Sequence, residues 1–253
     1  MDLGLSGLKV LVTGGTKGIG RHCAEIFAAD GAHVAICARG EAGVAQTVAS
    51  LEAKGVTAFG RAVDVSDKAA LESWVADAAD ALGGIDIVVG NVSALDVGEE
   101  ESSWEAEFRT DMMHSVRLVN AAMPHLERSQ AASITLISSV SGREVDFTGA
   151  PYGVFKAALV RYAQDLAFKL AGKNIRANTV SPGNTYFEGG IWQWIETNDP
   201  ALFAKALALN PTGRMAKPEE VARAVVFLAS PVSSFTTGTN LVVDGALTRG
   251  VQL

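Results

Sequence analysis

Residues 9–27 read KVLVTGGTKGIGRHCAEIF, and this stretch decides the fold. An apolar strand at Leu8–Val12 runs into the glycine-rich turn Thr13–Gly20, and a helix over 18–30 follows directly. Glycines at such a turn let the chain bend tightly and let a diphosphate approach backbone N–H groups at a helix N-terminus. A turn that merely connects two elements is the alternative, but this one stands in the strand–turn–helix context that nucleotide binding requires.

The rest of the chain repeats the alternation of strand and helix. The expected strands are Leu8–Val12, His33–Ala38, Thr57–Val63, Ile85–Val89, Ser133–Ser138, Asn174–Val180 and Asn240–Val243. The expected helices cover 18–30, 41–54, 67–82, 99–127, 151–171 and 218–230. Several strands are continuous apolar runs, which is typical of strands covered on both faces. The pattern predicts an α/β fold with a doubly wound, mostly parallel seven-stranded sheet and helices on both faces.

Length and composition favour one domain without a nucleic-acid or membrane partner. The chain has 253 residues, enough for a sizeable core, and 48% of them are hydrophobic. No linker, repeat or low-complexity tract divides it, so we expect a single domain over 1–253. The net charge of −7 is spread along the chain, which argues against binding to nucleic acid or an anionic membrane.

Three further features of the sequence bear on the cellular compartment, membrane insertion and metal binding. Cys23 and Cys37 fall on an expected helix and strand, so we predict buried, reduced thiols in a cytoplasmic protein. The first residues, MDLGLSGLKVLVTGG, do not have the pattern of a signal peptide, and no stretch is long enough to span a bilayer. The four histidines have no metal-ligand spacing, so we expect no metal site.

A second stretch, Ser139–Lys156, carries groups suited to proton transfer, and it reads SVSGREVDFTGAPYGVFK. In a helix over 151–171, Tyr152 and Lys156 share one face, and an ammonium beside a phenol favours the phenolate. A free tyrosine titrates near pH ~10, so it needs this help to exchange protons near neutrality. Taken alone, the pair could equally be a core tyrosine with a solvated lysine.

Several motifs in a fixed order make nearly the whole chain similar to one family. Besides the turn spacing Thr-Gly-x-x-x-Gly-x-Gly, they are Asp64-Val65, Pro182-Gly183, Thr237-Gly238 and Val243-Asp244-Gly245. Together with the serine, tyrosine and lysine of the second stretch, they resemble the short-chain dehydrogenase/reductase family. The similarity is to its single-domain branch of this length, which includes 3-oxoacyl reductases. The resemblance implies a Rossmann-type fold and direct hydride transfer between a nicotinamide cofactor and a carbonyl carbon.

The resemblance also implies residue roles. Tyr152 would be the general acid in reduction and the base in oxidation, and Ser139 would polarise the substrate oxygen. Lys156 would hold the nicotinamide ribose and lower the tyrosine pKa. Asp111 falls where the family usually has an asparagine that joins this catalytic group. The implied cofactor-binding residues are Gly14, Thr16, Lys17, Gly18, Ile19, Gly20, Arg39, Asp64, Val65, Asn91, Tyr152, Lys156, Pro182, Gly183 and Thr185.

The end of the second strand predicts NADP(H) in preference to NAD(H). NAD-dependent folds of this type place an acid there, where it bonds the ribose 2′-OH and repels a 2′-phosphate. Here Ala38 occupies the position and Arg39 follows it. A guanidinium suits a phosphate, and Lys17 in the turn could approach the same group. Both cations could instead be ordinary solvated surface residues.

Two departures from the family pattern leave a non-catalytic alternative open. Gly90–Ser93 replaces the usual Asn-Asn-Ala-Gly, so the cofactor wall could be tighter or shifted. Asp111 cannot donate a hydrogen bond when ionised. It could hold a water, or pair with Lys156 and alter how far that cation shifts the pKa of Tyr152. A nucleotide-binding sensor without turnover is the resulting alternative, and the retained serine, tyrosine and lysine weigh against it.

The segment 184–215 is expected to cover the substrate. It is dense in large apolar groups, and Gly189-Gly190 would suit a flexible joint. The resemblance implies a mobile lid whose apolar groups meet either an apolar or aromatic substrate or a neighbouring subunit. The expected substrate contacts are Ser141, Val145, Phe147, Phe187 and Trp192.

The sequence thus predicts a cytoplasmic ketoreductase that interconverts a ketone and a secondary alcohol on a hydrophobic small molecule. An NAD-dependent alcohol dehydrogenase of the same family is the alternative within the enzyme class. In relatives the helices corresponding to 99–127 and 151–171 are dimerising faces, and the C-terminal strand often adds a second interface. The resemblance therefore implies a homotetramer, although a dimer stays open.

Overall fold

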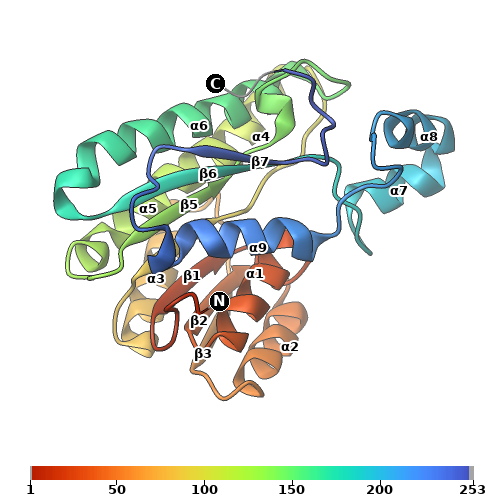
Figure 1. The fold of residues 1–253 in the computed structure, drawn as a ribbon. Helices are drawn as coiled ribbons and strands as arrows, with labels where there is room; N and C mark the ends of the chain where they lie inside the picture. The colour runs from red at the N-terminus through yellow and green to blue at the C-terminus, as the bar shows by residue number, and fades with distance from the viewer. Residues whose placement is uncertain (1, 251–253) are drawn as a thin grey trace.

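A computed structural model describes residues 2–250. It contains one parallel sheet of seven strands in the order β3-β2-β1-β4-β5-β6-β7 (Figure 1). The strands are β1 (Lys9–Thr13), β2 (His33–Ala38), β3 (Ala58–Ala62), β4 (Ile87–Gly90), β5 (Ser133–Ile137), β6 (Arg176–Pro182) and β7 (Asn240–Val243). The strand order reverses between β1 and β4, which confirms the predicted doubly wound, Rossmann-type fold.

Helices cover both faces of this sheet (Figure 1). They are α1 (Gly18–Ala29), α2 (Glu41–Glu52), α3 (Lys68–Leu82), α4 (Glu101–Glu107), α5 (His114–Leu126), α6 (Ala150–Leu170), α7 (Ile191–Asn198), α8 (Pro200–Ala208) and α9 (Pro218–Ala229). One layer holds α1, α2 and α9, and the other holds α3, α5 and α6. Each layer closes its own apolar core against the sheet, one around Phe27 and Ile36 and the other around Trp74 and Leu118.

The long helix expected over 99–127 is interrupted in the structure. A π-helical segment, η1 (Phe108–Met113), separates α4 from α5. Wide turns of this kind occur often at functional sites because they change which side chains face inward. Here the segment carries Asp111 into the interior, where the residue is fully buried.

The expected start of the sixth strand was wrong by two residues. Asn174 has a φ of 56°, in the left-handed region, and ends the short 3-10 helix η3 (Ala171–Lys173). A residue with that backbone cannot continue into an extended strand, so β6 begins at Arg176. Two other short 3-10 helices are η2 (Val140–Gly142) and η4 (Pro231–Ser233).

Segment 184–215 contains two helices, α7 and α8, that were not expected from the sequence. They project beyond the carboxyl ends of the strands (Figure 1). Their contact is a small apolar cluster built on Trp192, Ile195, Ala206 and Met215. Because this cluster is separate from the two main cores, the segment has packing of its own.

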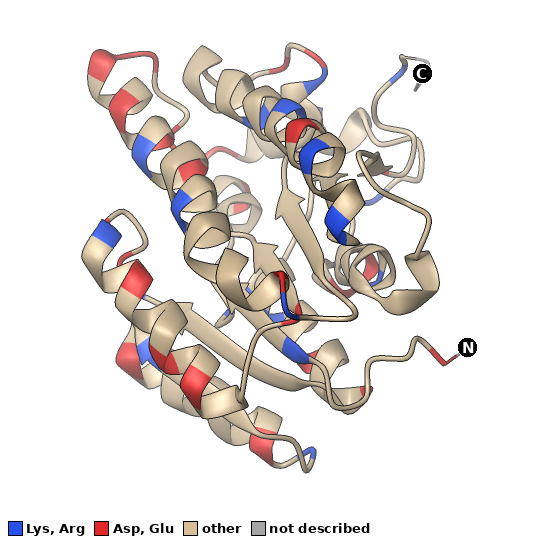
Figure 2. Cartoon of the chain, turned by 90° about the vertical axis from the view of Figure 1, so that its left-hand side faces the viewer, with Lys and Arg blue, Asp and Glu red and all other residues tan. Residues whose placement is uncertain are grey.

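Both cysteines are free and buried, as predicted. Burial raises the pKa of the Cys23 thiol and of the Cys37 thiol, so neither is a ready nucleophile. Charged residues of both signs are interspersed along the helices on the side of the molecule drawn in Figure 2. Within residues 2–250, no helix has the length and apolar character needed to cross a membrane.

Arg176 joins β6 to the end of α9, and its replacement should destabilise the fold. Its guanidinium donates to the carbonyl oxygens of Leu228, Ala229 and Ser230 at 2.6–3.0 Å, which satisfies the C-terminal carbonyls of that helix. Arg176→Met keeps the aliphatic stem and loses these charge-assisted bonds. We expect the free energy of unfolding to fall by about 2–3 kcal/mol in urea titrations. A loss no larger than that of a surface control, Arg161→Met, would contradict this role.

Candidate active site

The glycine-rich turn links β1 to α1 through a backbone that side chains would obstruct. Gly14 and Gly18 have φ angles of 67° and 54°, which favour glycine. A Cβ on Gly20 would lie 2.4 Å from the carbonyl oxygen of Gly14, so even alanine is excluded there. The backbone N–H of Gly14 donates to the Cys37 carbonyl at 2.8 Å, which ties the turn to the end of β2.

Asn91, directly after β4, braces the turn from the other side. Its side-chain amide donates to the carbonyl oxygens of Thr13 at 3.1 Å and Gly14 at 3.4 Å. Its backbone N–H donates to the Thr13 hydroxyl at 3.0 Å. The asparagine retained within the altered Gly90–Ser93 stretch therefore holds the shape of the turn.

The start of α1 fits a diphosphate. Lys17 is the N-cap residue and makes no side-chain cap, and the first turn has no acidic residue. The backbone N–H groups at this end are therefore free of any side-chain acceptor from the cap. The aligned peptide dipoles favour an anion at the same place. A dinucleotide cofactor thus matches the donors and the charge that these residues present.

The other expected cofactor residues gather at the same edge of the sheet, at the carboxyl ends of its strands. Exposed Arg39 follows β2, and Asp64 and Val65 follow β3. Hydrogen bonds from Ser66 lower the pKa of Asp64, with a smaller contribution from the charge of Arg39. Thr16 lies in the turn and Ile19 in the first turn of α1, while Pro182 ends β6 and is followed by Gly183 and Thr185.

The catalytic candidates converge at the same carboxyl edge of the sheet, after β5. Tyr152 and Lys156 project from the first turns of α6, and Ser139 is the N-cap residue of η2. The Lys156 ammonium lies 5.5 Å from the centre of the Tyr152 ring and donates to the Ile137 carbonyl at 3.1 Å. The same ammonium is 2.8 Å from Asp111 Oδ1, in a buried ion pair. The structure thus brings these side chains into one buried cluster.

Tyr152 is harder to ionise in this structure than the sequence reading expected. Burial raises its pKa, while the charge of Lys156 and a hydrogen bond from Ser139 lower it by less. Asp111 adds a negative charge that raises the pKa again. Lys156 lowers the pKa of Tyr152 in the expected direction, but burial outweighs it and leaves the net pKa raised, with a smaller contribution from the Asp111 carboxylate.

Glu107 belongs to the same cluster, and the sequence reading missed it. Burial first, and then a hydrogen bond and charge from Asp111, raise the pKa of Glu107 to about 8. Its Oε1 accepts from the backbone N–H of Asp96 at 2.7 Å. The signal was present in the sequence, because Glu107 precedes Asp111 by four residues and two such residues share a helix face.

The expected substrate residues fall into different places. Phe147 and Trp192 pack edge to face with ring centres 5.4 Å apart, which joins the loop before α6 to α7. The Ser141 hydroxyl donates to the Asp146 carboxylate at 2.6 Å. The Val145 side chain is fully exposed, so the structure does not bring it into this cluster.

Phe187 lies against the cofactor turn. A Cβ on Gly18 would meet its ring at 2.7 Å, and the Lys17 ammonium donates to the Gly189 carbonyl at 3.3 Å. Thr185 donates its hydroxyl to the Gly183 carbonyl at 3.0 Å and is buried. The segment before α7 therefore closes over the start of α1.

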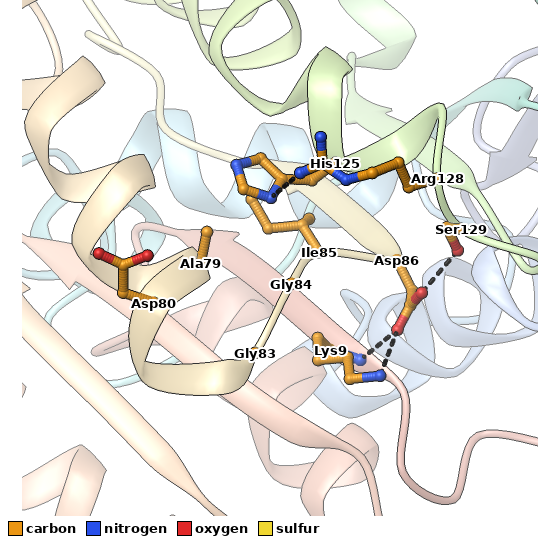
Figure 3. Close-up of a pocket in the computed structure, with 10 residues that line it drawn as sticks. All are labelled: Lys9, Ala79, Asp80, Gly83, Gly84, Ile85, Asp86, His125, Arg128 and Ser129. Carbon is orange, nitrogen blue, oxygen red and sulfur yellow. Dashed lines mark hydrogen bonds and ion pairs between the residues drawn. The ribbon is translucent and has the colours of Figure 1, made fainter.

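A separate surface hollow lies at the opposite edge of the sheet, at the amino-terminal ends of β1 and β4 (Figure 3). Its lining residues are Lys9, Ala79, Asp80, Gly83, Gly84, Ile85, Asp86, His125, Arg128 and Ser129. Asp86 accepts from the backbone N–H of Lys9 at 2.9 Å and from Ser129, and Arg128 lies 3.1 Å from His125 Nδ1. These contacts join strands to their connecting loops at a distance from the glycine-rich turn.

The chain is similar to a family model and to several known proteins. A family model described as enoyl-(acyl carrier protein) reductase matches residues 14–248. The isoepoxydon dehydrogenase of Penicillium expansum is 40% identical over 100% of this chain and 99% of its own length. The structure of L-sorbose reductase from Gluconobacter frateurii, complexed with NADPH and L-sorbose, has a TM-score of 0.92 at 28% identity, covering 99% of this chain and 100% of that chain. A 7α-hydroxysteroid dehydrogenase complexed with NADH and 7-oxo glycochenodeoxycholic acid has a TM-score of 0.90 at 26% identity, covering 97% and 96%.

A doubly wound sheet with this turn at its switch point defines a dinucleotide-binding class of protein. Within that class, the chain belongs to the short-chain dehydrogenase/reductase family, as its motifs predicted. It is an oxidoreductase that acts on CH–OH donors, with a nicotinamide cofactor.

Proposed function

We propose that the protein interconverts a ketone and a secondary alcohol with NADP(H), using Tyr152 as general acid in reduction and general base in oxidation. The observation that carries this proposal is the buried cluster of Ser139, Tyr152, Lys156 and Asp111 at the carboxyl edge of the sheet. Ligands of doubly wound folds bind at that edge, beside the point where the strand order reverses.

Each side chain has a definite part in the reaction. A bound nicotinamide supplies the hydride to the carbonyl carbon, or accepts it in the reverse direction. The Ser139 hydroxyl donates a hydrogen bond to the carbonyl oxygen, and the phenolic proton of Tyr152 passes to that oxygen as negative charge develops on it. Lys156, fixed by Asp111 and the Ile137 carbonyl, stabilises the resulting phenolate by its charge.

Preference for NADP(H) follows from the charges around the turn. Arg39 is exposed beside it, and no acid stands at Ala38 to repel a 2′-phosphate. Lys17 would join Arg39 at the phosphate on releasing the Gly189 carbonyl. An NAD-dependent alcohol dehydrogenase is the alternative, and fluorescence titrations with NADPH and NADH separate the two.

The substrate side favours a hydrophobic or aromatic ketone. Phe147 and Trp192 form an aromatic wall, and α7 and α8 would cover it as a lid within the single domain 1–253. A 3-oxoacyl thioester reductase is one role compatible with this wall. Ketone reduction by the purified protein tests the catalytic proposal against a nucleotide sensor, which would bind NADPH without turnover.

We further propose a cytoplasmic homotetramer. A cytoplasmic setting would keep Cys23 and Cys37 reduced. The faces expected to pair carry exposed apolar side chains that a neighbouring subunit would cover. These side chains are Trp104, Phe108, Val154 and Phe168 on the α4–α6 side, and Phe227, Val232 and Phe235 near α9.

Val154 provides a test of the α6 interface. Because its side chain is exposed in the single chain, Val154→Arg should fold normally but place a charge within the subunit contact. We expect light scattering to show a smaller assembly, with the far-ultraviolet circular dichroism spectrum unchanged. The matched control is Ala45→Arg on exposed α2. Equal assembly of both variants would contradict an interface at this face.

A further inference from the structure

Two acidic residues one turn apart, Glu107 and Asp111, are buried near Lys156. Glu107 closes α4 and Asp111 lies one turn later in η1, and neither side chain is exposed. Two of their four oxygens accept backbone hydrogen bonds, and a third lies in an ion pair with Lys156. Backbone N–H groups of Asp96 and Ala94 donate to Glu107 Oε1 and Asp111 Oδ2 at 2.7 and 2.8 Å, and Asp111 Oδ1 is 2.8 Å from the Lys156 ammonium.

The fourth oxygen, Glu107 Oε2, is buried and has no hydrogen-bond donor among the described residues. Asp111 Oδ1, although it contacts the Lys156 ammonium, likewise has no hydrogen-bond partner among the described residues, and each of the two carboxyl groups shifts the pKa of the other. Two buried carboxylates one turn apart repel each other, which favours a neutral form of one of them. If Glu107 carries that proton, its orphaned buried acceptor becomes a donor for the neighbouring carboxylate.

The charges that face Glu107 come from each element packed around it. Lys156 and Tyr152 act on it from α6 and Asp111 from η1, while Asp96 contributes its backbone N–H from the loop after β4. His114 in α5 interacts with Asp111 and Lys156 of the same cluster. His114 is fully buried, and burial lowers its pKa to about 4, so it is neutral near pH 7. One cation is therefore available for two acids, and the 2.8 Å contact assigns it to Asp111.

We propose that Glu107 is a positioning residue that holds the single proton of the Glu107–Asp111 pair and thereby sets how readily Tyr152 ionises. This inference deepens the proposed function and rests on it for its effect on turnover. With its proton in place, Glu107 donates to Asp111 and fixes that carboxylate against Lys156. When Glu107 ionises, a second negative charge enters the cluster and opposes formation of the Tyr152 phenolate.

The charge of Glu107 determines the direction in which it changes the pKa of Tyr152. Burial is the largest cause that raises the pKa of Tyr152, and the negative charge of Glu107 is one of the smaller ones that act in the same direction. Alcohol oxidation requires the phenolate, so ionisation of Glu107 should hold back the rise of the oxidation rate with pH. Ketone reduction requires the neutral phenol and should be little affected on the acid side.

Infrared spectroscopy tests whether Glu107 carries a proton, and it needs neither enzyme activity nor coenzyme. A difference spectrum of the wild-type protein between about pH 6 and about pH 10 should contain the carbonyl stretching band of a buried protonated carboxylic acid, lost at the higher pH. The band should be missing in Glu107→Gln and retained in Glu105→Gln, which alters an exposed acid of the same helix. A wild-type spectrum without the band, or a band that persists in Glu107→Gln, overturns the proposal even if the enzyme is an active ketoreductase.

The pH profile of oxidation tests the consequence. Glutamine at 107 can still donate to Asp111 and accept from the Asp96 N–H, so Glu107→Gln keeps the contacts and removes only the ionisation. We expect the rising limb of log kcat for alcohol oxidation with NADP+ to move about one pH unit lower, and Glu105→Gln to leave it in place. A profile identical to that of the wild type would overturn the role of Glu107. If no alcohol is oxidised, the proposed function fails instead, and the infrared result stands on its own.

Discussion

Tyr152→Phe should reduce turnover by about 10²–10⁴-fold, because it removes the hydroxyl group that we propose as the general acid and base. The substitution deletes a single hydroxyl from a ring that is 9% exposed and leaves the packing of α6 intact. The Lys156–Asp111 ion pair and the glycine-rich turn do not depend on that hydroxyl. We therefore expect NADPH to bind with little change in fluorescence titrations while kcat for ketone reduction collapses.

Tyr162→Phe is the matched control. It makes the same chemical change on the same helix, at a tyrosine whose pKa burial raises to about 12. Its kcat should stay within about twofold of the wild type, since Tyr162 packs against the apolar core and not in the catalytic cluster. Turnover by Tyr152→Phe within about tenfold of the wild type would assign the proton to another group.

Because the pKa of Tyr152 is raised, reduction and oxidation should depend on pH in different ways. Burial is the main cause, and it keeps the phenol protonated through neutral pH in the ligand-free protein. Reduction should therefore proceed at neutral pH, whereas oxidation should accelerate as the pH rises toward the tyrosine pKa. Bound cofactor and substrate change the charge around the phenol, so pH profiles of kcat and of kcat/KM report different states.

The fold could be predicted from sequence because its signals are local. Apolar runs such as Ser133–Ile137 are buried along their whole length, and glycines mark the turn where a tight backbone is required. The break in the helix expected over 99–127 had no such signal, because π-helical turns are set by packing. The helices α7 and α8 were missed for a similar reason, since their apolar residues were read as a surface for substrate or subunits.

The candidate site was only partly predictable. Motif spacing identified Ser139, Tyr152 and Lys156 individually, and a single helix places the tyrosine and lysine together. The position of Asp111 against Lys156 depends on how η1 crosses α6, which no local pattern specifies. Glu107 was missed because an acid on a predicted helix normally points to solvent, and only the tertiary structure shows that this one is buried.

The altered Gly90–Ser93 stretch is accommodated in the structure and does not obstruct the fold of the turn. Asn91 retains three hydrogen bonds to the β1 end of the turn. Val92 packs against Gly14, where a Cβ would meet its methyl group at 3.1 Å. The bulkier side chain thus occupies the space that a glycine leaves open, which weakens the case for a protein that lost turnover through this substitution.

Arg39→Asp should invert the coenzyme preference. The exposed guanidinium stands after β2, next to the glycine-rich turn that Cys37 ties to the same strand end. A 2′-phosphate bound there would lose its charge-assisted hydrogen bonds, each about 1.5–3 kcal/mol, and would meet a carboxylate. The same carboxylate would accept a hydrogen bond from the 2′-OH of NAD(H). We expect the ratio of kcat/KM for NADPH to that for NADH to fall by about 10²–10⁴-fold.

Two further variants separate the causes of that inversion. Arg39→Gln removes the cation without adding an acid, so it should weaken NADPH binding while leaving NADH nearly unchanged. Lys54→Asp makes the same change in net charge at an exposed position beyond α2, and its coenzyme ratio should match the wild type. If Arg39→Asp leaves the ratio unaltered, Lys17 alone would have to read the phosphate, and Lys17→Ala should then cause the loss. If Arg39→Asp and Lys17→Ala both leave the coenzyme ratio unchanged, these two cations do not recognise the 2′-phosphate, and the charge argument fails.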